Sequence, residues 1–155
     1  LANPTDYNTR ANIMWAATQA LNGLIGVGVT QDWATHMIGH ELTALFGIDH
    51  ARTLAVVLPS LLRHRKEDKK DKLLQYAERV WGLSGKDDDE LIKMGIQKTE
   101  EFFHHLGVPT RLSDHQVDLK QTTPIVTRFS EQNARMGERQ SIDADAVEAI
   151  LRASA

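Results

Sequence analysis

The chain has 155 residues, of which 41% are apolar, 25% are charged and none is cysteine, and its net charge is −3. This composition fits one globular domain with its own core, and it excludes disulfides and thiolate metal ligands. The slight negative charge argues against general nucleic-acid binding, and no apolar run approaches the ~20 residues that cross a bilayer. We therefore expect a cytoplasmic protein with neither a nucleic-acid nor a membrane partner. The first residue is Leu1 and not methionine, so we also expect a processed protein or a piece of a longer one.

Apolar residues recur at helical spacing almost throughout the chain, and no segment alternates as a strand does. The first helix is expected over about residues 5–22, with Asp6 or Thr5 as its cap. Its apolar face consists of Ile13, Met14, Ala17 and Leu21. Three glycines within residues 23–28 then predict a loop that packs closely against another segment.

The second helix is expected over about residues 30–46 and the third over about 49–64, with Gly47 breaking the chain between them. Asp49 is a plausible cap for the third helix. Pro59 lies inside that helix and is expected to kink or divide it, since proline removes a backbone donor and clashes with the preceding turn.

Charges of both signs crowd residues 63–72, which we interpret as a solvated turn and the exposed start of the next helix. Further helices are expected over about residues 69–81, 84–106, 122–132 and 143–153. The prediction is an all-α fold, a bundle of six to eight helices forming a single domain over residues 1–155. Its core or core edge is expected to hold Trp15, Trp33 and Trp81.

Three histidines fall within fifteen residues, and they are the strongest functional signal in the sequence. His36 and His40 are four apart, so on a helix they share one face, and His50 follows the break at Gly47. A helix, a tight turn and a second helix can therefore bring all three imidazoles to one cleft. Imidazole is a common zinc ligand and the usual acid or base near neutral pH, so the cluster predicts metal binding or proton transfer.

The remaining histidines have simpler structural explanations. His64 lies in the charged run and is expected to be exposed, while the His104–His105 pair suits the negative end of a helix dipole. His115 lies in a loop next to an acidic residue, with nothing to support a role. A zinc-peptidase site is disfavoured because the glutamate follows the second histidine of the pair instead of the first.

Residues 31–59 resemble the signature of the iron-containing (group III) alcohol dehydrogenases. This segment runs from Gln31-Asp-Trp-Ala-Thr-His36 through His40-Glu-Leu-Thr to His50-Ala-Arg-Thr-Leu. The resemblance is closest to their butanol-dehydrogenase-like branch of NADPH-dependent aldehyde reductases. It extends to residues 12–23, 73–81 and 103–110 and so covers essentially the whole chain.

The resemblance implies that His36 and His50 are metal ligands, with Fe2+ or Zn2+ as the metal. It implies that His40, between them, lies by the substrate and nicotinamide and takes part in proton transfer or positioning. The implied activity is reduction of aldehydes to primary alcohols, in which the metal polarises the carbonyl and NADP(H) delivers the hydride.

The family has two domains, of the dehydroquinate-synthase-like type, and this chain resembles only the later part of the helical C-terminal one. The resemblance implies that the remaining metal ligands, an Asp and a His, and the NADP(H) site lie upstream of Leu1. We therefore assign no residue of this chain to NADP(H) and expect the chain alone to be inactive, with an incomplete ligand set. The expected partners are a small aldehyde or alcohol, the N-terminal domain of its own full-length chain, and a second copy in a homodimer.

Two other functions stay open on the residues alone. The chain could be an autonomous helical metal-binding module, which would need a further ligand such as Glu41, Asp49 or His115. It could also be a structural helical domain that works through protein contacts.

Overall fold

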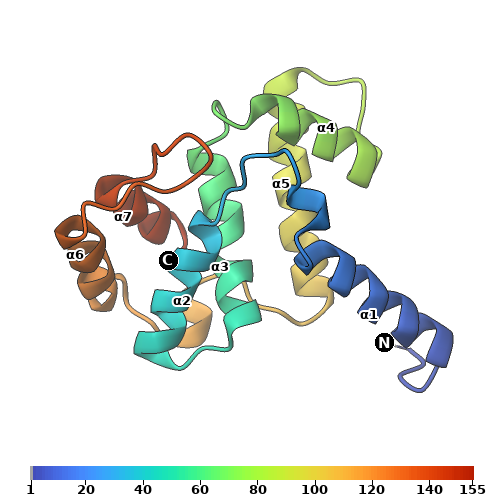
Figure 1. Ribbon diagram of the computed structural model, residues 1–155, viewed down its shortest axis with the longest axis horizontal. Coiled ribbons are helices and arrows are strands. Elements are labelled where there is room, and N and C mark those ends of the chain that lie inside the picture. Colours follow the sequence, from blue (N-terminus) through green and yellow to red (C-terminus); the bar gives the residue numbers. More distant parts are fainter. Residues whose placement is uncertain (1) are drawn as a thin grey trace. The chain divides into compact units, whose positions relative to one another are not determined.

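The computed structural model describes residues 2–155, which fall into an N-terminal unit, Leu1–Asp32, and a main unit, Trp33–Ala155. Over the described residues the chain forms seven α-helices and three short 3-10 helices and has no strand, which confirms the predicted all-α fold (Figure 1). The α-helices are α1 (Tyr7–Leu21), α2 (Ala34–Phe46), α3 (His50–His64), α4 (Lys70–Trp81), α5 (Asp88–His105), α6 (Thr123–Glu131) and α7 (Ala144–Ala153). The 3-10 helices are η1 (Leu24–Gly26), η2 (Ser113–His115) and η3 (Leu119–Thr122).

The N-terminal unit consists of α1 and η1. Asp6 caps α1 as predicted, because its carboxylate accepts the backbone N–H of Thr9 at 3.2 Å. The glycine-rich loop forms η1, where a side chain at Gly26 would collide with that of Gln31. No residue of α1 is buried, and Trp15 is 66% exposed, so the prediction that this tryptophan lies in a core is wrong for this structure.

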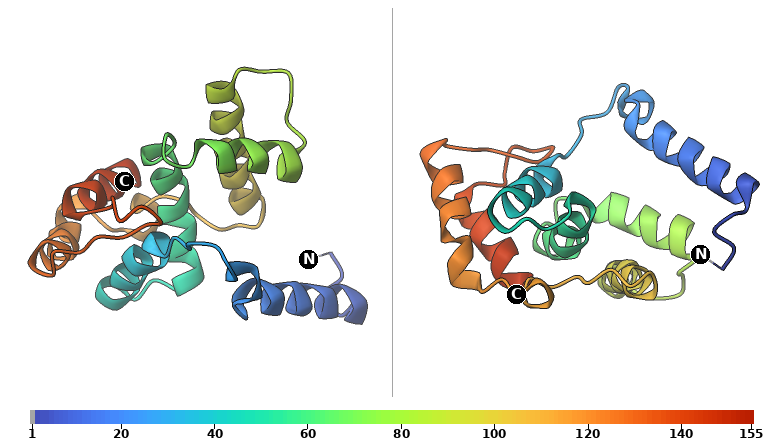
Figure 2. Two further views of the ribbon diagram at one scale, coloured as in Figure 1. Left: turned by 45° about the horizontal axis from the view of Figure 1, so that its top comes forward. Right: turned by 90° about the horizontal axis from the view of Figure 1, so that it is seen from below.

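The main unit is organised around α3, which packs against α2, α5 and α7. Its neighbours form two further pairs, α4 with α5 and α6 with α7. Figures 1 and 2 show the α2–α3 pair between these two pairs in every view. The arrangement follows from α3, whose buried residues lie on several of its faces (Thr53, Ala55, Val56, Val57, Pro59, Ser60 and Leu61).

The main hydrophobic core joins α2, α3, α6 and α7 with the loops at residues 112–117 and 136–142. Its fully buried side chains include Ile38, Leu42, Leu61, Leu112, Ile125, Ile142, Ile150 and Leu151. A smaller cluster of Leu73, Ile92 and Ile96 holds α4 against α5. The positions at helical spacing thus form two buried apolar clusters, as their periodicity predicted.

Three local predictions are corrected by the structure. Helix α2 begins at Ala34, with Trp33 as its cap residue, and not at residues 30–32. Pro59 does not divide α3, which runs without interruption from His50 to His64. Trp33 is 47% exposed and so lies outside the core.

The charged run at residues 63–72 is less solvated than predicted. Arg65 is paired with Asp68 and also donates to the hydroxyl of Ser141. Lys69 binds the carboxylate of Glu138 at 2.6 Å, and its side chain is only 11% exposed. These contacts fasten the turn between α3 and α4 to the loop at residues 136–142, which closes on itself through an antiparallel bridge between Met136 and Ile142.

No helix within residues 2–155 is both long enough and apolar enough to cross a membrane.

Candidate functional site

The α2–α3 hairpin positions the three histidines. Helix α2 is terminated by Gly47, whose φ of 68° is a left-handed conformation that glycine adopts without strain. The chain then turns within three residues, and α3 begins at His50. Gly39 lets the two helices approach closely, because a Cβ there would lie 2.9 Å from the hydroxyl of Thr53. This close packing brings the first residue of α3 back over the face of α2.

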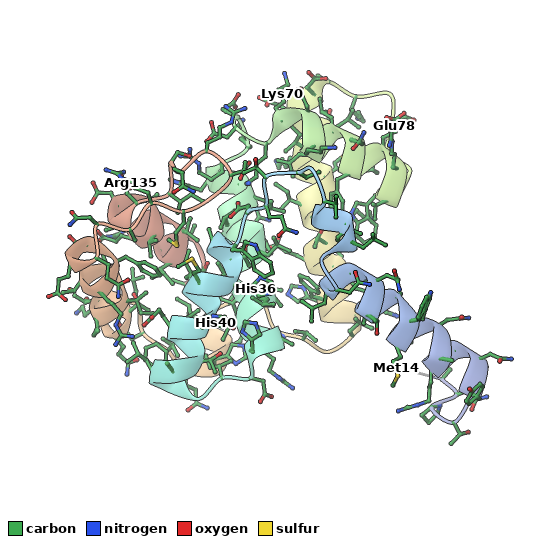
Figure 3. All side chains as sticks on the ribbon, in the orientation of Figure 1. Met14, His36, His40, Lys70, Glu78 and Arg135 are labelled. Carbon is green, nitrogen blue, oxygen red and sulfur yellow. The ribbon has the colours of Figure 1, made fainter. Side chains whose placement is uncertain are left out.

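The structure brings the three imidazoles together as the spacing predicted. The ring centroids of His36 and His50 are 5.3 Å apart, and those of His40 and His50 are 4.5 Å apart. The rings of His36 and His40 are 6.2 Å apart on one face of α2, where Figure 3 labels them. The Trp33 ring meets His36 edge-on at 5.1 Å, so this exposed tryptophan forms one border of the cluster.

The environment favours the neutral form of His36. Its pKa is lowered, first by burial and then by the nearby rings of His50 and His40, which repel a positive charge. A neutral imidazole has a lone pair on one nitrogen, and that lone pair is what a metal ion requires. His36 and His50 are half-buried, whereas His40 is exposed.

Two side-chain atoms beside the cluster are buried without a hydrogen-bond partner. They are Nδ1 of His50 and the hydroxyl oxygen of Thr43. Thr43 continues the stripe of His36 and His40 along α2, since residues 36, 40 and 43 recur at helical spacing. Thr43 was not among the predicted site residues, because helical spacing alone does not single it out.

The arrangement of the rings fits one metal ion held by two histidines. Rings that share a zinc ion through Zn–N bonds of about 2.0–2.1 Å have centroids roughly 5 Å apart, close to the 5.3 Å between His36 and His50. Within residues 2–155, however, no group of three or more His, Cys, Asp or Glu side chains is placed to hold a metal together. The assignment of His36 and His50 as metal ligands therefore stays a prediction.

The acidic side chains nearest the cluster in sequence are engaged elsewhere. Glu41 accepts from Arg128 of α6 at 2.7 Å. Asp49 is exposed and lies 3.6 Å from Arg52, its neighbour on α3. His115 is on η2, and its Nε2 is buried without a partner. These contacts give no support to an additional ligand from within the described chain.

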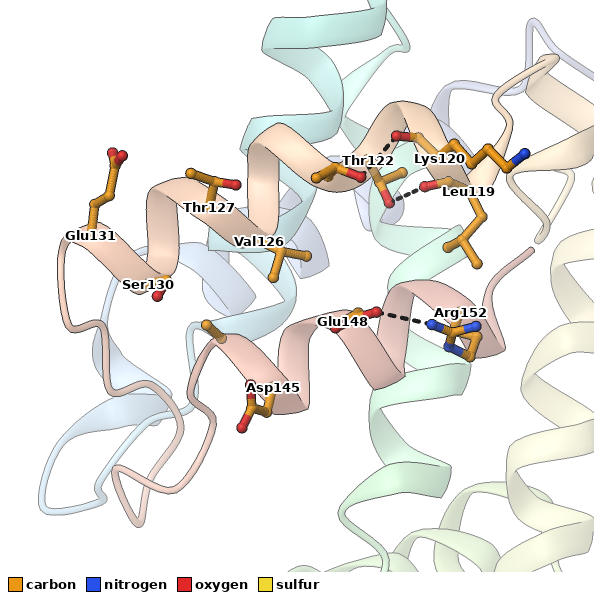
Figure 4. A pocket seen from close by; sticks show the side chains of 12 residues that line it. Leu119, Lys120, Thr122, Val126, Thr127, Ser130, Glu131, Asp145, Glu148 and Arg152 are labelled. Atoms are coloured by element: carbon orange, nitrogen blue, oxygen red, sulfur yellow. Dashed lines mark hydrogen bonds and ion pairs between the residues drawn. The ribbon is translucent and has the colours of Figure 1, made fainter.

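A separate groove lies between η3, α6 and α7 (Figure 4). It has a volume of about 570 Å³, and an ion pair between Glu148 and Arg152 crosses its wall. None of the three clustered histidines lines it.

The comparisons with known proteins agree with these observations. Residues 1–155 match the family described as "Fe-containing alcohol dehydrogenase family, C-terminal". The chain therefore belongs to the iron-containing alcohol dehydrogenase family, and it corresponds to the C-terminal part of that family.

Two relatives show how much of such a protein the chain represents. It is 52% identical to the NADPH-dependent aldehyde reductase YqhD of Escherichia coli (strain K12), over 99% of this chain and 40% of the relative. It is 35% identical to the probable NADH-dependent butanol dehydrogenase 1 of Bacillus subtilis (strain 168), over 96% of this chain and 39% of the relative. The chain thus spans about two fifths of the length of these relatives.

Solved structures show the same fold. The substrate- and cofactor-free aldehyde reductase YqhD from E. coli matches with a TM-score of 0.97 and 51% identity, over 100% of this chain and 41% of that one. The NADH-dependent butanol dehydrogenase A of Thermotoga maritima matches with a TM-score of 0.89 and 30% identity, over 98% of this chain and 40% of that one.

Proposed function

We propose that this chain is the C-terminal helical part of a metal-dependent alcohol dehydrogenase that reduces aldehydes to primary alcohols with NADPH. His36 and His50 are its metal ligands, and His40 acts on the substrate. The observation that carries the proposal is the gathering of three imidazoles, 4.5–6.2 Å apart, in a member of this family.

The reaction moves a hydride from the nicotinamide of NADPH to the carbonyl carbon and a proton to the carbonyl oxygen, giving NADP+ and a primary alcohol. The metal, when bound, supplies a positive charge that polarises the carbonyl bond. His36 and His50 would each supply one ring nitrogen to it, and burial keeps the pKa of His36 below its usual value, so that protons compete less for its lone pair. His40 is the exposed member of the cluster, and its ring can reach both solvent and a molecule bound beside His50, so we assign it the proton transfer.

The two histidines need further ligands to complete a metal site. We infer that these ligands and the NADP(H) site belong to the part of the relatives that this chain does not cover. The chain by itself is then inactive, and its partners are that remaining part, a small aldehyde or alcohol, and a second copy in a homodimer. A bound Fe2+ or Zn2+ ion and a cytoplasmic location also stay predictions.

A chimera tests the activity directly. This chain would replace the matching C-terminal part of the E. coli aldehyde reductase, whose sequence is 52% identical there. We expect the metal-loaded chimera to reduce aldehydes with NADPH, and the double variant His36→Ala/His50→Ala to be inactive. His40→Ala should lower kcat by about 10²- to 10⁴-fold, whereas His105→Ala, at the exposed end of α5, should not change it. A chimera that folds by circular dichroism but oxidises no NADPH would contradict the proposal.

Calorimetry on the 155-residue chain separates this proposal from an autonomous metal-binding module. Weak Zn2+ or Fe2+ binding that disappears in His36→Ala/His50→Ala indicates a partial site, as proposed. Sub-micromolar binding would mean that the chain completes the ligand set itself, and the module would then be the better explanation.

A further inference from the structure

The seam between α2 and α3 holds two buried polar atoms whose hydrogen-bonding capacity is unused. Nδ1 of His50 and the hydroxyl oxygen of Thr43 each have no partner. Buried polar groups are normally paired, and an unpaired one destabilises the fold, so two such atoms on adjoining helices require an explanation.

The packing register places these two residues opposite each other. Helices α2 and α3 run in opposite directions (Figure 1), and Gly39 of α2 packs against Thr53 and Leu54 of α3. One helical turn from Gly39 toward the hairpin is Thr43, and one turn from Leu54 toward the hairpin is His50. Thr43 and His50 therefore face each other across the α2–α3 interface, one helical turn closer to the hairpin than Gly39 and Leu54.

The two nitrogens of the His50 ring have different surroundings. Nδ1 is next to Cγ, so it stays near the backbone and the seam, where it is buried. Nε2 is at the far end of a ring whose centroid is 4.5 Å from that of His40 and 5.3 Å from that of His36. A neutral imidazole carries its hydrogen on only one nitrogen, and the hydrogen bond made by one nitrogen decides whether the other is free to bind a metal.

We propose that the Thr43 hydroxyl accepts the Nδ1–H of His50, directly or through one bridging water, and so keeps Nε2 unprotonated for the metal. Thr43 is then a positioning residue that acts through His50. The role in metal binding rests on the proposed function, but the tautomer of His50 is a property of the chain without metal. Partners of this kind fix the orientation and tautomer of metal-binding histidines, and their loss typically weakens metal binding about 10- to 100-fold.

The test reads the tautomer of His50 by two-bond ¹H–¹⁵N correlation in the metal-free 155-residue chain, above the ordinary histidine pKa of about 6.5. Thr43→Val removes the hydroxyl and keeps the shape, and Thr43→Ser keeps the hydroxyl. We expect His50 to carry its hydrogen on Nδ1 in the parent chain and in Thr43→Ser, and to shift toward the Nε2–H form in Thr43→Val. An unchanged His50 tautomer in Thr43→Val would overturn the proposal.

Zinc titration provides a second readout on the same variants. Thr43→Val should lose about tenfold or more in Zn2+ affinity while Thr43→Ser stays close to the parent chain. Equal affinity in all three chains would also overturn the role of Thr43. If the 155-residue chain alone binds no zinc, because its ligand set is incomplete, the tautomer measurement by itself decides between a Thr43 contact and none. Thr43→Ala replaces Thr43→Val in both measurements if the valine variant does not fold.

Discussion

The N-terminal unit and the main unit both consist of helices that the sequence predicts, but their side chains are buried to very different degrees. Between Tyr7 and Gln31 only Arg10 is charged, yet Ile13 is 64% exposed and Met14 is 73% exposed. In α7, by contrast, apolar residues at the same helical spacing are buried, and Ile150 is 0% exposed. A single helix of about 15 residues is marginal in water, and a charge-poor helix is typical of a buried one. The local sequence therefore predicts a helix in both units. It does not show whether other residues of this chain bury the apolar side chains of that helix.

The test with the largest expected effect makes the same substitution, isoleucine to alanine, in both units. Ile150→Ala should lower the free energy of unfolding by about 2–5 kcal/mol, because it leaves a cavity in the main core. Ile13→Ala should change it by less than about 0.5 kcal/mol, since its side chain is largely exposed. Urea unfolding of the 155-residue chain measures both values. Equal losses would show that α1 is packed as tightly as α7 and would remove the contrast between the units.

The second test concerns metal binding. We expect it in the main unit, because residues 1–32 contain no histidine. His36→Ala/His50→Ala should reduce Zn2+ affinity at least about tenfold, because it removes both nitrogen ligands. His104→Ala/His105→Ala, a pair at the exposed end of α5, is the matched control and should leave affinity unchanged. Calorimetry at fixed pH gives both constants, and equal weakening in the two double variants would locate binding outside the cluster.

The third test compares two helix caps. Asp143 caps α7 by accepting the N–H of Ala146 at 3.1 Å, so Asp143→Ala should cost about 1 kcal/mol of unfolding free energy. Asp6 caps α1 in the same way, but Asp6→Ala should reduce only the helical circular dichroism signal, because α1 buries no residue. An equal loss of unfolding free energy in both variants would mean that α1 unfolds together with the main core.

The cap of α7 also predicts a pH dependence. The Ala146 N–H, and then Arg135, lower the pKa of the Asp143 carboxyl. The unfolded chain binds this proton more readily, so the stabilisation is complete above the unfolded pKa and is lost as pH falls through the folded one. Asp143→Asn, which keeps an acceptor without the charge, should flatten that part of the acid unfolding curve.

The smallest expected effect comes from His36. Because its pKa is lowered in the folded chain, the unfolded chain binds a proton first as pH falls below about 6.5. Stability should therefore decrease from there toward the lower folded pKa. His36→Gln should remove part of this decrease, and thermal unfolding at several pH values measures it. A steeper decrease in the variant than in the parent chain would contradict the sign.

The sequence predicted the helices well because helical periodicity is a local property. All seven α-helices were expected, and the cap at Asp6 was among the proposed ones. It missed η2 and η3, which are short and have no periodicity to detect. It also missed the contact between Lys69 and Glu138, because pairing across 69 positions depends on the tertiary fold.

The candidate site was predictable for the same reason, with one exception. The spacing of His36 and His40 and the break at Gly47 were sufficient to predict that three rings meet, and the ring distances confirm it. The importance of Thr43 was not predictable from its own spacing alone. It depends on which residue of α3 lies opposite, and the close approach at Gly39 decides that register.

The position of α7 in the order of synthesis has a consequence for how the chain folds in a cell. Val147, Ile150 and Leu151 belong to the main core, and α7 is the last helix of the described residues. While the ribosome is still making this segment, Val56, Val57 and Leu61 of α3 cannot be covered by it. The nascent protein therefore carries an open apolar surface until α7 has been synthesised, and it is during this interval that a chaperone would bind it or neighbouring nascent chains would aggregate with it.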